Sequence, residues 1–488
     1  MIKLRGRRRL EFLTKKEIYN IHSATLEVLK DVGVKVRNKQ ALKILDEFGV
    51  SVDYKNERAY FPEYIVDEAI KNSKTAFNYY GRNYEQRLQI ENGNVYFLDG
   101  GTALNVVDLN GEYRRATLKD LANFVRLYDA LPNVDFIAGP TFPTNIPENV
   151  HHLYDYLTKI ENTSKPFTHA HYTHAGEAKD LIKLALIVAG GFDELLRRPS
   201  IMGWENPVSP LTHDNLQIEN LLEFASYGLP VLIAPAVQSG ATGPASLGGV
   251  LVQQNAEILS GFVLVHAVAQ RRRRSPLIYG TAAATFDMRF GTTIYSSPEA
   301  VLLNIASVQL AKYYNVPCRG TGGVTETYFL DMQAGYETSI SLAMLVLAGC
   351  NLIMDATGGA LGPGVDAMSF EKAVIDNEIV EYISWILKGI NISKDTLAVD
   401  VIRDVIMHGK TYLSHKHTMD VFQQEHFMPR FSNRKVYRAL KKENGDIIKR
   451  ANREVRKILR EHKPTPIDKN LKEELIAVIK KIEKEKLT

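Results

Sequence analysis

The spacing of apolar side chains predicts helices at the start of the chain. Apolar residues recur every three or four positions after Thr14, and Thr14 with Glu17 forms a capping-box signature. This pattern predicts a helix over residues 14–32 that ends at Gly33. A second amphipathic stretch covers residues 39–48, and a third follows Pro62, which suits a first helical turn. We therefore expect residues 1–93 to form an N-terminal helical cap.

From residue 94 onward, short β-prone runs alternate with longer helical stretches. Each run is followed by enough chain for a crossover helix. The alternation of eight strands with helices is typical of the α/β class and of a closed (β/α)8 barrel of the TIM type. We predict such a barrel over residues 94–400. The runs cover residues 95–107, 134–139, 166–172, 200–205, 230–236, 276–280, 316–320 and 352–357.

Two further helical regions complete the predicted architecture. Residues 246–269 are apolar enough to resemble a membrane span, but Gln253, Gln254, Asn255 and Glu257 interrupt them, which favours a buried barrel helix. Residues 401–488 are helical and charged, and we expect them to pack on the barrel as a C-terminal extension. The last helix carries one apolar stripe for docking: Leu471, Leu475, Ile476, Val478, Ile479 and Ile482.

Composition and charge narrow the class of protein. The 488 residues are 45% hydrophobic and 24% charged, which is typical of a folded protein. Two cysteines exclude a disulfide framework, and the absence of an apolar leader favours the cytoplasm. Five of the first ten residues are Lys or Arg, and residues 429–488 hold 19 Lys and Arg against 9 Asp and Glu. We interpret these basic ends, and the loop Arg271 to Arg274, as solvated faces or subunit contacts of a homo-oligomer. We expect neither nucleic acid nor a membrane as a partner.

Chemistry in a (β/α)8 barrel takes place at the carboxyl ends of the strands. His169 and His171 lie two residues apart, so their side chains share one face of a strand, as a metal site or a substrate-binding site would require. They are also compatible with an ordinary structural role. Because the sequence has no HExxH motif, no pair of cysteine ligands and no carboxylate cluster at metal spacing, we expect no bound metal. Other candidates at strand ends or in the loops that follow are Tyr172, Glu205, Asn206, Gln238, Tyr279, Phe286, Asp287, Arg319, Glu326, Tyr328, Asp331, Gln333 and Asp355.

Several segments resemble one known family. Ser209-Pro210-Leu211, the stretch 251–257 with its Gln253-Gln254-Asn255, Asp287-Met288-Arg289, the stretch 331–337 and the late His417-Thr418 are similar to the trimethylamine/glycine betaine corrinoid methyltransferases. The similarity extends in order over nearly the whole chain. It implies a methyltransferase that moves a methyl group from a small methylated amine to the Co(I) of a corrinoid (cobalamin) on a separate small protein.

The resemblance also narrows the substrate. Family members that contain pyrrolysine act on trimethylamine, and they carry this residue in the loop that corresponds to residues 321–330, where this chain has only standard residues. The chain therefore resembles the branch that uses betaines such as glycine betaine. A quaternary nitrogen is already cationic, so its methyl group is transferred without a general acid.

A betaine substrate would require specific roles of the candidate residues. An aromatic cage would hold the cation, and Arg319, His169 or His171 would anchor a carboxylate. Glu205 and Asn206 are further substrate-binding candidates, and Glu326 and Asp331 would position the loop. Two alternatives remain open: another methylated amine (carnitine, proline betaine or trimethylamine), or a non-catalytic protein that binds quaternary amines. We assign the cage to Tyr172, Tyr279, Phe286 and Tyr328, and the contact with the corrinoid to Gln238, Asp287, Gln333 and Asp355.

Overall fold

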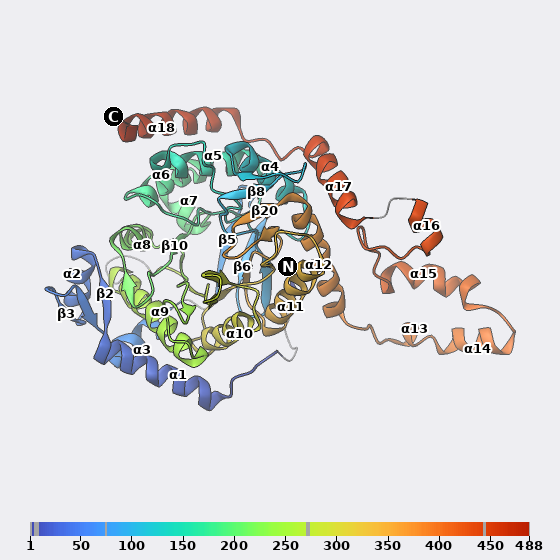
Figure 1. Cartoon of the computed structure of the whole chain (residues 1–488), viewed down its shortest axis with the longest axis horizontal. Helices are drawn as coiled ribbons and strands as arrows, with labels where there is room; N and C mark the ends of the chain where they lie inside the picture. Colours follow the sequence, from blue (N-terminus) through green and yellow to red (C-terminus); the bar gives the residue numbers. More distant parts are fainter. Residues whose placement is uncertain (1, 4–8, 74–75, 270–273, 443–445, 488) are drawn as a thin grey trace.

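A computed structural model describes residues 2–3, 9–73, 76–269, 274–442 and 446–487 (Figure 1). Three of the N-terminal cations, Arg5, Arg7 and Arg8, lie outside the described residues, as do Arg271 to Arg273 of the basic loop.

The centre of the molecule is a sheet of six parallel strands. Their spatial order is β7, β18, β17, β14, β12 and β10, and the short β1 (Ile2–Lys3) pairs antiparallel with β7 at one edge. Almost every residue of the six strands is buried, as expected when helices cover a parallel sheet. The strands are β7 (Asn94–Phe97), β10 (Gly203–Glu205), β12 (Val231–Ile233), β14 (Leu277–Gly280), β17 (Cys318–Thr321) and β18 (Leu352–Met354).

Each of these strands falls within, or within one residue of, a predicted run. The predicted runs 134–139 and 166–172 carry single parallel bridges instead of regular strands: Leu98 pairs with Phe136, and Ile137 pairs with Phe167. Beyond them, the Thr168 hydroxyl donates to the Met202 carbonyl at 3.1 Å, just before β10. The chain is therefore a mixed α/β protein whose parallel sheet continues past β7.

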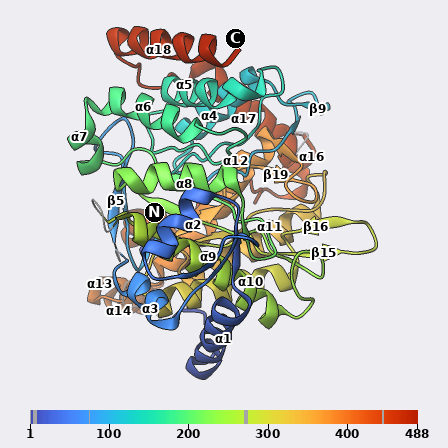
Figure 2. The ribbon, with the colours of Figure 1, turned by 90° about the vertical axis from the view of Figure 1, so that its left-hand side faces the viewer.

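Long helices lie around this sheet in both views (Figures 1 and 2). Their ends follow local sequence signals: Thr117 and Asp120 form a capping box at the start of α4, and glycines in the left-handed conformation end α6, α8 and α11. Helix α9 coincides with the predicted buried helix, and no helix in the described part of the chain is long and apolar enough to cross a membrane. The helices are α4 (Leu118–Ala130), α5 (His151–Asn162), α6 (Glu177–Ala189), α7 (Phe192–Arg197), α8 (Asn215–Tyr227), α9 (Leu247–Ala269), α10 (Pro298–Tyr313), α11 (Met332–Ala348) and α12 (Phe370–Lys388).

The N-terminal segment contains the three predicted helices and also strands that the pattern did not indicate. The capping box of Thr14 and Glu17 is present, and α1 (Lys15–Glu27) continues as one π-helical segment over Val28–Val32. Helices α2 (Lys39–Glu47) and α3 (Glu63–Lys71) follow. Strands of two to four residues are too short to give a clear alternation, which explains why they were missed. They are β2 (Val34–Val36), β3 (Ser51–Asp53), β4 (Arg58–Tyr60), β5 (Phe77–Tyr80) and β6 (Arg87–Ile90). Strand β2 also pairs in parallel with β11 (Thr212–His213), which comes from the chain after β10.

Short strands also lie in the loops beyond the carboxyl ends of the central strands. One small sheet consists of β19, β20, β8 and β9, and another of β13, β15 and β16. These loops surround the candidate site described below. The strands are β8 (Asn105–Val107), β9 (Tyr113–Arg115), β13 (Gln238–Ser239), β15 (Ala284–Asp287), β16 (Thr292–Ile294), β19 (Ala360–Leu361) and β20 (Ala367–Ser369).

The described part of the C-terminal region is mostly helical. Helix α18 lies across α5 and α6 (Figure 2), where Leu475, Ile479 and Ile482 of the predicted stripe are buried and Lys486 pairs with Asp180 at 2.9 Å. Helix α17 packs on α4 and α12, whereas α13, α14 and α15 project from the side of the molecule (Figure 1). The helices are α13 (Lys394–Leu397), α14 (Val399–Met407), α15 (Lys416–Glu425), α16 (Tyr437–Lys442), α17 (Ile447–Glu461) and α18 (Lys469–Leu487).

Candidate active site

A cavity of about 180 Å³ lies at the carboxyl ends of the central strands. It is smaller than the roughly 300–1,000 Å³ of pockets for drug-sized ligands, so it suits a small molecule. Each central strand contributes a residue at its end or in the loop that follows, which is where parallel sheets place their binding sites. The lining residues are Gly101, His171, Trp204, Asn206, Ala236, Ala282, Tyr295, Arg319, Thr321, Met354, Asp355, Gly364 and Val365.

Arg319 brings a buried cation to this cavity. Its guanidinium donates from Nη1 to the Thr281 carbonyl and, at 2.9 Å, to the Thr321 hydroxyl, and it lies 5.5 Å from the centre of the Trp204 ring. Burial lowers the pKa of Arg319, although the group remains charged near neutral pH. Within the described chain, Arg319 Nε is buried and has no hydrogen-bond acceptor. The side chain is thus held on one side and has a donor left for a ligand.

Asp355 supplies the opposite charge. Its backbone is left-handed, with φ at +65°, directly after β18. Burial raises the pKa of Asp355 to about 6, although the charge of Arg319 and the Gly101 amide act in the opposite direction. Among the residues that the structure describes, none donates a hydrogen bond to Asp355 Oδ1, which is also buried. One cavity therefore holds an unsatisfied cationic donor and an unsatisfied anionic acceptor.

The remaining walls are aromatic or neutral. Trp204 and Tyr295 line the cavity, and the Trp204 indole donates to Asn206 Oδ1 at 3.3 Å. Burial raises the pKa of Tyr295 to about 12, so its hydroxyl stays protonated. Burial, together with the neighbouring His169, lowers the pKa of His171 to about 3, so its imidazole is neutral at physiological pH. The cavity thus combines one fixed charge pair with π-faces and neutral hydrogen-bonding groups.

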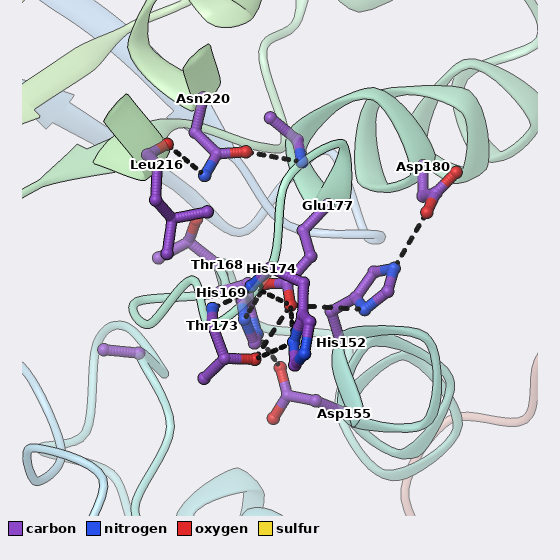
Figure 3. A network of polar contacts seen from close by, with 12 residues as sticks. His152, Asp155, Thr168, His169, Thr173, His174, Glu177, Asp180, Leu216 and Asn220 are labelled. Atoms are coloured by element: carbon purple, nitrogen blue, oxygen red, sulfur yellow. Dashed lines mark hydrogen bonds and ion pairs between the residues drawn. The ribbon is translucent and has the colours of Figure 1, made fainter. Parts of the chain in front are cut away.

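His169 takes part in a separate buried network beside the cavity (Figure 3). Its Nδ1 lies 2.8 Å from Asp155 Oδ2, and the Lys159 ammonium donates to the same oxygen at 2.7 Å. Lys159 also donates to the carbonyls of Ala138 and Thr168. Burial alone would raise the pKa of Asp155, but Lys159 and His169 outweigh it and hold this pKa below its usual value. This network fixes the segment that presents His171, two residues further on.

Comparison with known proteins shows the family of this chain. The model of the trimethylamine methyltransferase family matches residues 2–486. The chain belongs to this family. It is 33% identical to a glycine betaine methyltransferase from Desulfitobacterium hafniense, with 96% of both chains covered, and 32% identical to a trimethylamine methyltransferase from the same species, with 96% of this chain and 93% of the relative covered. A trimethylamine methyltransferase from Methanosarcina barkeri is 30% identical over 97% of this chain and 96% of its own.

A solved structure agrees at the level of the fold. The crystal structure of the monomethylamine methyltransferase of Methanosarcina barkeri aligns with a TM-score of 0.54 and covers 95% of this chain and 90% of that one, at 11% identity. Members of the matched family are methyltransferases, and the predicted family and enzyme class are therefore confirmed.

The cavity of this methyltransferase contains four of the predicted site residues and leaves others outside. His171, Asn206, Arg319 and Asp355 line it. Glu205 does not: its carboxylate binds His213 at 2.5 Å, and His213 reaches Ser260 of α9 at 2.9 Å. Burial opposes the charge of His213, but Glu205 nevertheless raises its pKa.

The four predicted cage residues do not converge on the cavity. The Tyr279 hydroxyl donates to Asn255 of α9 at 3.0 Å, and Tyr172 packs edge-on against His169. Tyr328 donates to Asp366 at 3.1 Å, and Phe286 lies on the hairpin strand β15. These four rings therefore do not line the cavity, because position near a strand end does not reveal which way a side chain points. Trp204 and Tyr295 form the aromatic walls instead; Tyr295 follows β16, and Trp204 lies in a predicted strand.

The outer candidates stabilise the loops around the cavity. Glu326 Oε1 accepts the backbone amides of Tyr295 and Ser296 at 2.8 and 2.9 Å, so it positions one aromatic wall. Asp331 caps α11 by accepting the amides of Gln333 and Ala334. The other candidates interact with residues close to them in the sequence. Asp287 forms an ion pair with Arg289, the Gln333 side chain donates a hydrogen bond to Glu337, and the backbone N–H of Gln238 donates to the Thr242 hydroxyl.

Proposed function

We propose that this methyltransferase takes a methyl group from a carboxylated quaternary amine such as glycine betaine. The observation that supports this substrate is the pair of unsatisfied buried atoms, Arg319 Nε and Asp355 Oδ1, in one small cavity. A betaine carries both complementary charges: a carboxylate for the guanidinium, and a quaternary ammonium beside the aspartate and the Trp204 and Tyr295 rings. Trimethylamine lacks the carboxylate and would leave Arg319 without its partner.

The methyl acceptor is the corrinoid of a separate small protein, which supplies the nucleophile. The 180 Å³ cavity fits the amine but is far too small for a corrinoid ring, so the acceptor has to approach from outside. We infer that the six parallel strands and the bridged segments at Phe136 and Phe167 close into a (β/α)8 barrel, with the cavity at its rim. The loops with Gln238, Asp287 and Gln333 lie beyond the same strand ends and would face the corrinoid protein.

The residues of this chain have to bind and orient the donor without holding the positive charge too tightly. The ammonium charge disappears as the methyl group leaves, so a fixed anion would favour the substrate over the transition state. Burial raises the pKa of Asp355 to about 6, so near neutral pH its carboxylate supplies the negative charge beside the ammonium group. The π-faces of Trp204 and Tyr295 attract the cation more weakly than a full charge would and also accommodate the neutral amine product.

A substrate panel tests the proposed function. Free cob(I)alamin serves as methyl acceptor, and its absorbance reports methyl transfer from glycine betaine, carnitine, proline betaine, trimethylamine and tetramethylammonium. We expect turnover with a carboxylated quaternary amine and much less with trimethylamine. Turnover with trimethylamine alone would contradict the proposed substrate, and tight binding of a betaine with no transfer to cob(I)alamin or to a reduced corrinoid protein would indicate a binding protein.

Trp204 offers a more local test. We expect Trp204→Leu to raise KM for the quaternary amine by about 5- to 30-fold, because a desolvated cation–π contact contributes about 1–2 kcal/mol. The matched control is Trp385→Leu, which changes the other tryptophan, on α12 and outside the cavity. In that control Trp204 is the remaining tryptophan, so quenching of its fluorescence should report binding directly. An unchanged KM in Trp204→Leu would exclude the ring from the cation site.

A further inference from the structure

Residues 389–426 form a long segment that makes few packing contacts with the rest of the described structure. These residues, which we call the arm, leave the end of α12 and return beside it, where the Lys388 ammonium donates to the Gln424 carbonyl. The arm contains α13, α14, a short 3-10 turn (Tyr412–Ser414) and α15, and it projects from the body (Figure 1). Where the arm ends, Phe427 packs against Tyr382 and Trp385 of α12.

The arm exposes an unusual amount of apolar surface. Within this segment, which the structure describes in full, Val405 is the one buried residue. Helices of four to ten residues are not stable in water without tertiary packing, so the arm requires a partner surface. Large apolar surfaces that stay exposed on a protein commonly mark an interaction site. The exposed apolar side chains are Ile390, Ile392, Leu397, Val399, Ile402, Ile406, Met407, Tyr412, Leu413, Met419 and Phe422.

The body of the same chain offers a matching surface. On α11, Tyr336, Ile340 and Leu347 are exposed and lie at helical spacing on its outward face. On α12, which packs against α11, Tyr382 and Ile386 are exposed and lead directly into the arm. The outward face of a helix around a parallel sheet is ordinarily polar, so this apolar face also indicates an interface.

We propose that the arm of one copy packs against the outward face of α11 and α12 of a second copy, and that the exchange is reciprocal. A two-fold axis lets each copy supply both an arm and a receiving face, so one pair of surfaces closes the assembly. The charge of the arm permits this contact: it holds four Lys and Arg and five Asp and Glu residues, so it brings almost no net charge to an apolar face. Internal pairs such as Arg403 with Asp400 and Lys410 with Asp404 neutralise several of these charges.

The position of the arm favours a second copy over the protein that carries the methyl acceptor. Helix α12 begins just after Gly364 and Val365, which line the cavity, and the arm leaves its other end. At 1.5 Å per residue, the 19 residues of α12 separate the two by about 28 Å. A protein that docks at the cavity would therefore bind the opposite end of this helix.

Sedimentation velocity of the full chain at micromolar concentration tests the proposal. The parent protein should sediment as a dimer or as a higher assembly of dimers. Ile402→Glu/Ile406→Glu should weaken association by at least about 100-fold, because each substitution places a charge in an apolar interface. Ile340→Glu on the receiving face should do the same. The control is Val32→Glu, which changes an apolar residue with the same exposure as Ile402, 49% against 48%, on the N-terminal segment.

The masses of the parent protein and its variants distinguish the possible roles of the arm. A change to monomers in both the arm variant and the α11 variant, with Val32→Glu unaffected and circular dichroism unchanged, supports the reciprocal contact. A monomeric parent protein would overturn it, as would an arm variant that keeps the parent mass. If the parent is monomeric and the arm variant loses binding of a corrinoid protein, the arm is the docking site for that partner instead. The mass measurement requires no substrate, so it can fail while the proposed methyl transfer holds.

Discussion

Replacing Arg319 by Met should lower kcat/KM for glycine betaine by about 30- to 4,000-fold. The substitution removes the donor that would pair with the substrate carboxylate in a buried site, and truncation of one partner in such a pair costs about 2–5 kcal/mol. Met keeps much of the length of the side chain, so the packing against Trp204 is largely retained. Steady-state kinetics with free cob(I)alamin as acceptor measure the loss.

The substrate itself provides the sharpest control for this prediction. Tetramethylammonium carries the cation without a carboxylate, so its kcat/KM should change by less than about threefold in Arg319→Met. Arg289→Met is a matched substitution at an exposed arginine of the β15–β16 hairpin, which pairs with Asp287 outside the cavity, and it should leave both substrates unaffected. Equal losses for glycine betaine and tetramethylammonium in Arg319→Met would mean that Arg319 maintains the shape of the site and does not anchor a carboxylate.

The sequence predicted the sheet well because the relevant signals are local. Buried parallel strands appear as continuous apolar runs, and six of the predicted runs contain the strands of the central sheet. The run around Phe136 and the run around Phe167 were recognised by the same signal, although their pairing is reduced to single bridges. The capping box at Thr14 and the buried helix α9 could also be predicted from the sequence, since each depends on residues a few positions apart.

The site was predicted less completely, because its geometry depends on which way each side chain points. Tyr279 lies in a correctly predicted strand, yet its ring faces α9 and binds Asn255. In a regular strand, His169 and His171 would point to the same face. The chain has no regular strand after Thr168, however, and of the two histidines only His171 lines the cavity. Trp204 could have been predicted from the sequence. It immediately precedes the strand-end residue Glu205, and the alternation of side chains along a strand directs the two residues to opposite faces.

The carboxyl of Asp355 should make the activity of the enzyme depend on pH. Burial raises the pKa of its carboxyl to about 6, and a quaternary cation binds the ionised form better than the protonated form. In the parent enzyme, kcat/KM for the quaternary amine should therefore fall as the pH drops below about 6. Asp355→Asn should lower kcat/KM at pH 8 by about 30- to 1,000-fold, the equivalent of about 2–4 kcal/mol, and should abolish the acidic limb.

Asparagine suits this position because it tolerates the left-handed backbone at φ +65° better than most residues do. The sign of the stability effect distinguishes a lost charge from a damaged fold. An aspartate whose pKa is raised in the folded state stabilises the fold at low pH and loses that contribution as the pH rises through 6. Above pH 6, Asp355→Asn should therefore unfold at a temperature no lower than the parent protein does, even though it binds the cation less tightly.

Asp287→Asn is the control for the pH profile. Arg289 lowers the pKa of Asp287 to about 2, so that carboxylate does not titrate near pH 6 and its removal should leave the acidic limb in place. Retention of the limb in Asp355→Asn would assign the titration to a different group. Loss of the limb together with a lower unfolding temperature above pH 6 would instead mean that Asp355 is required to hold the loop after β18. Loss of the limb in a variant of undiminished stability would identify Asp355 as the anion that meets the ammonium group.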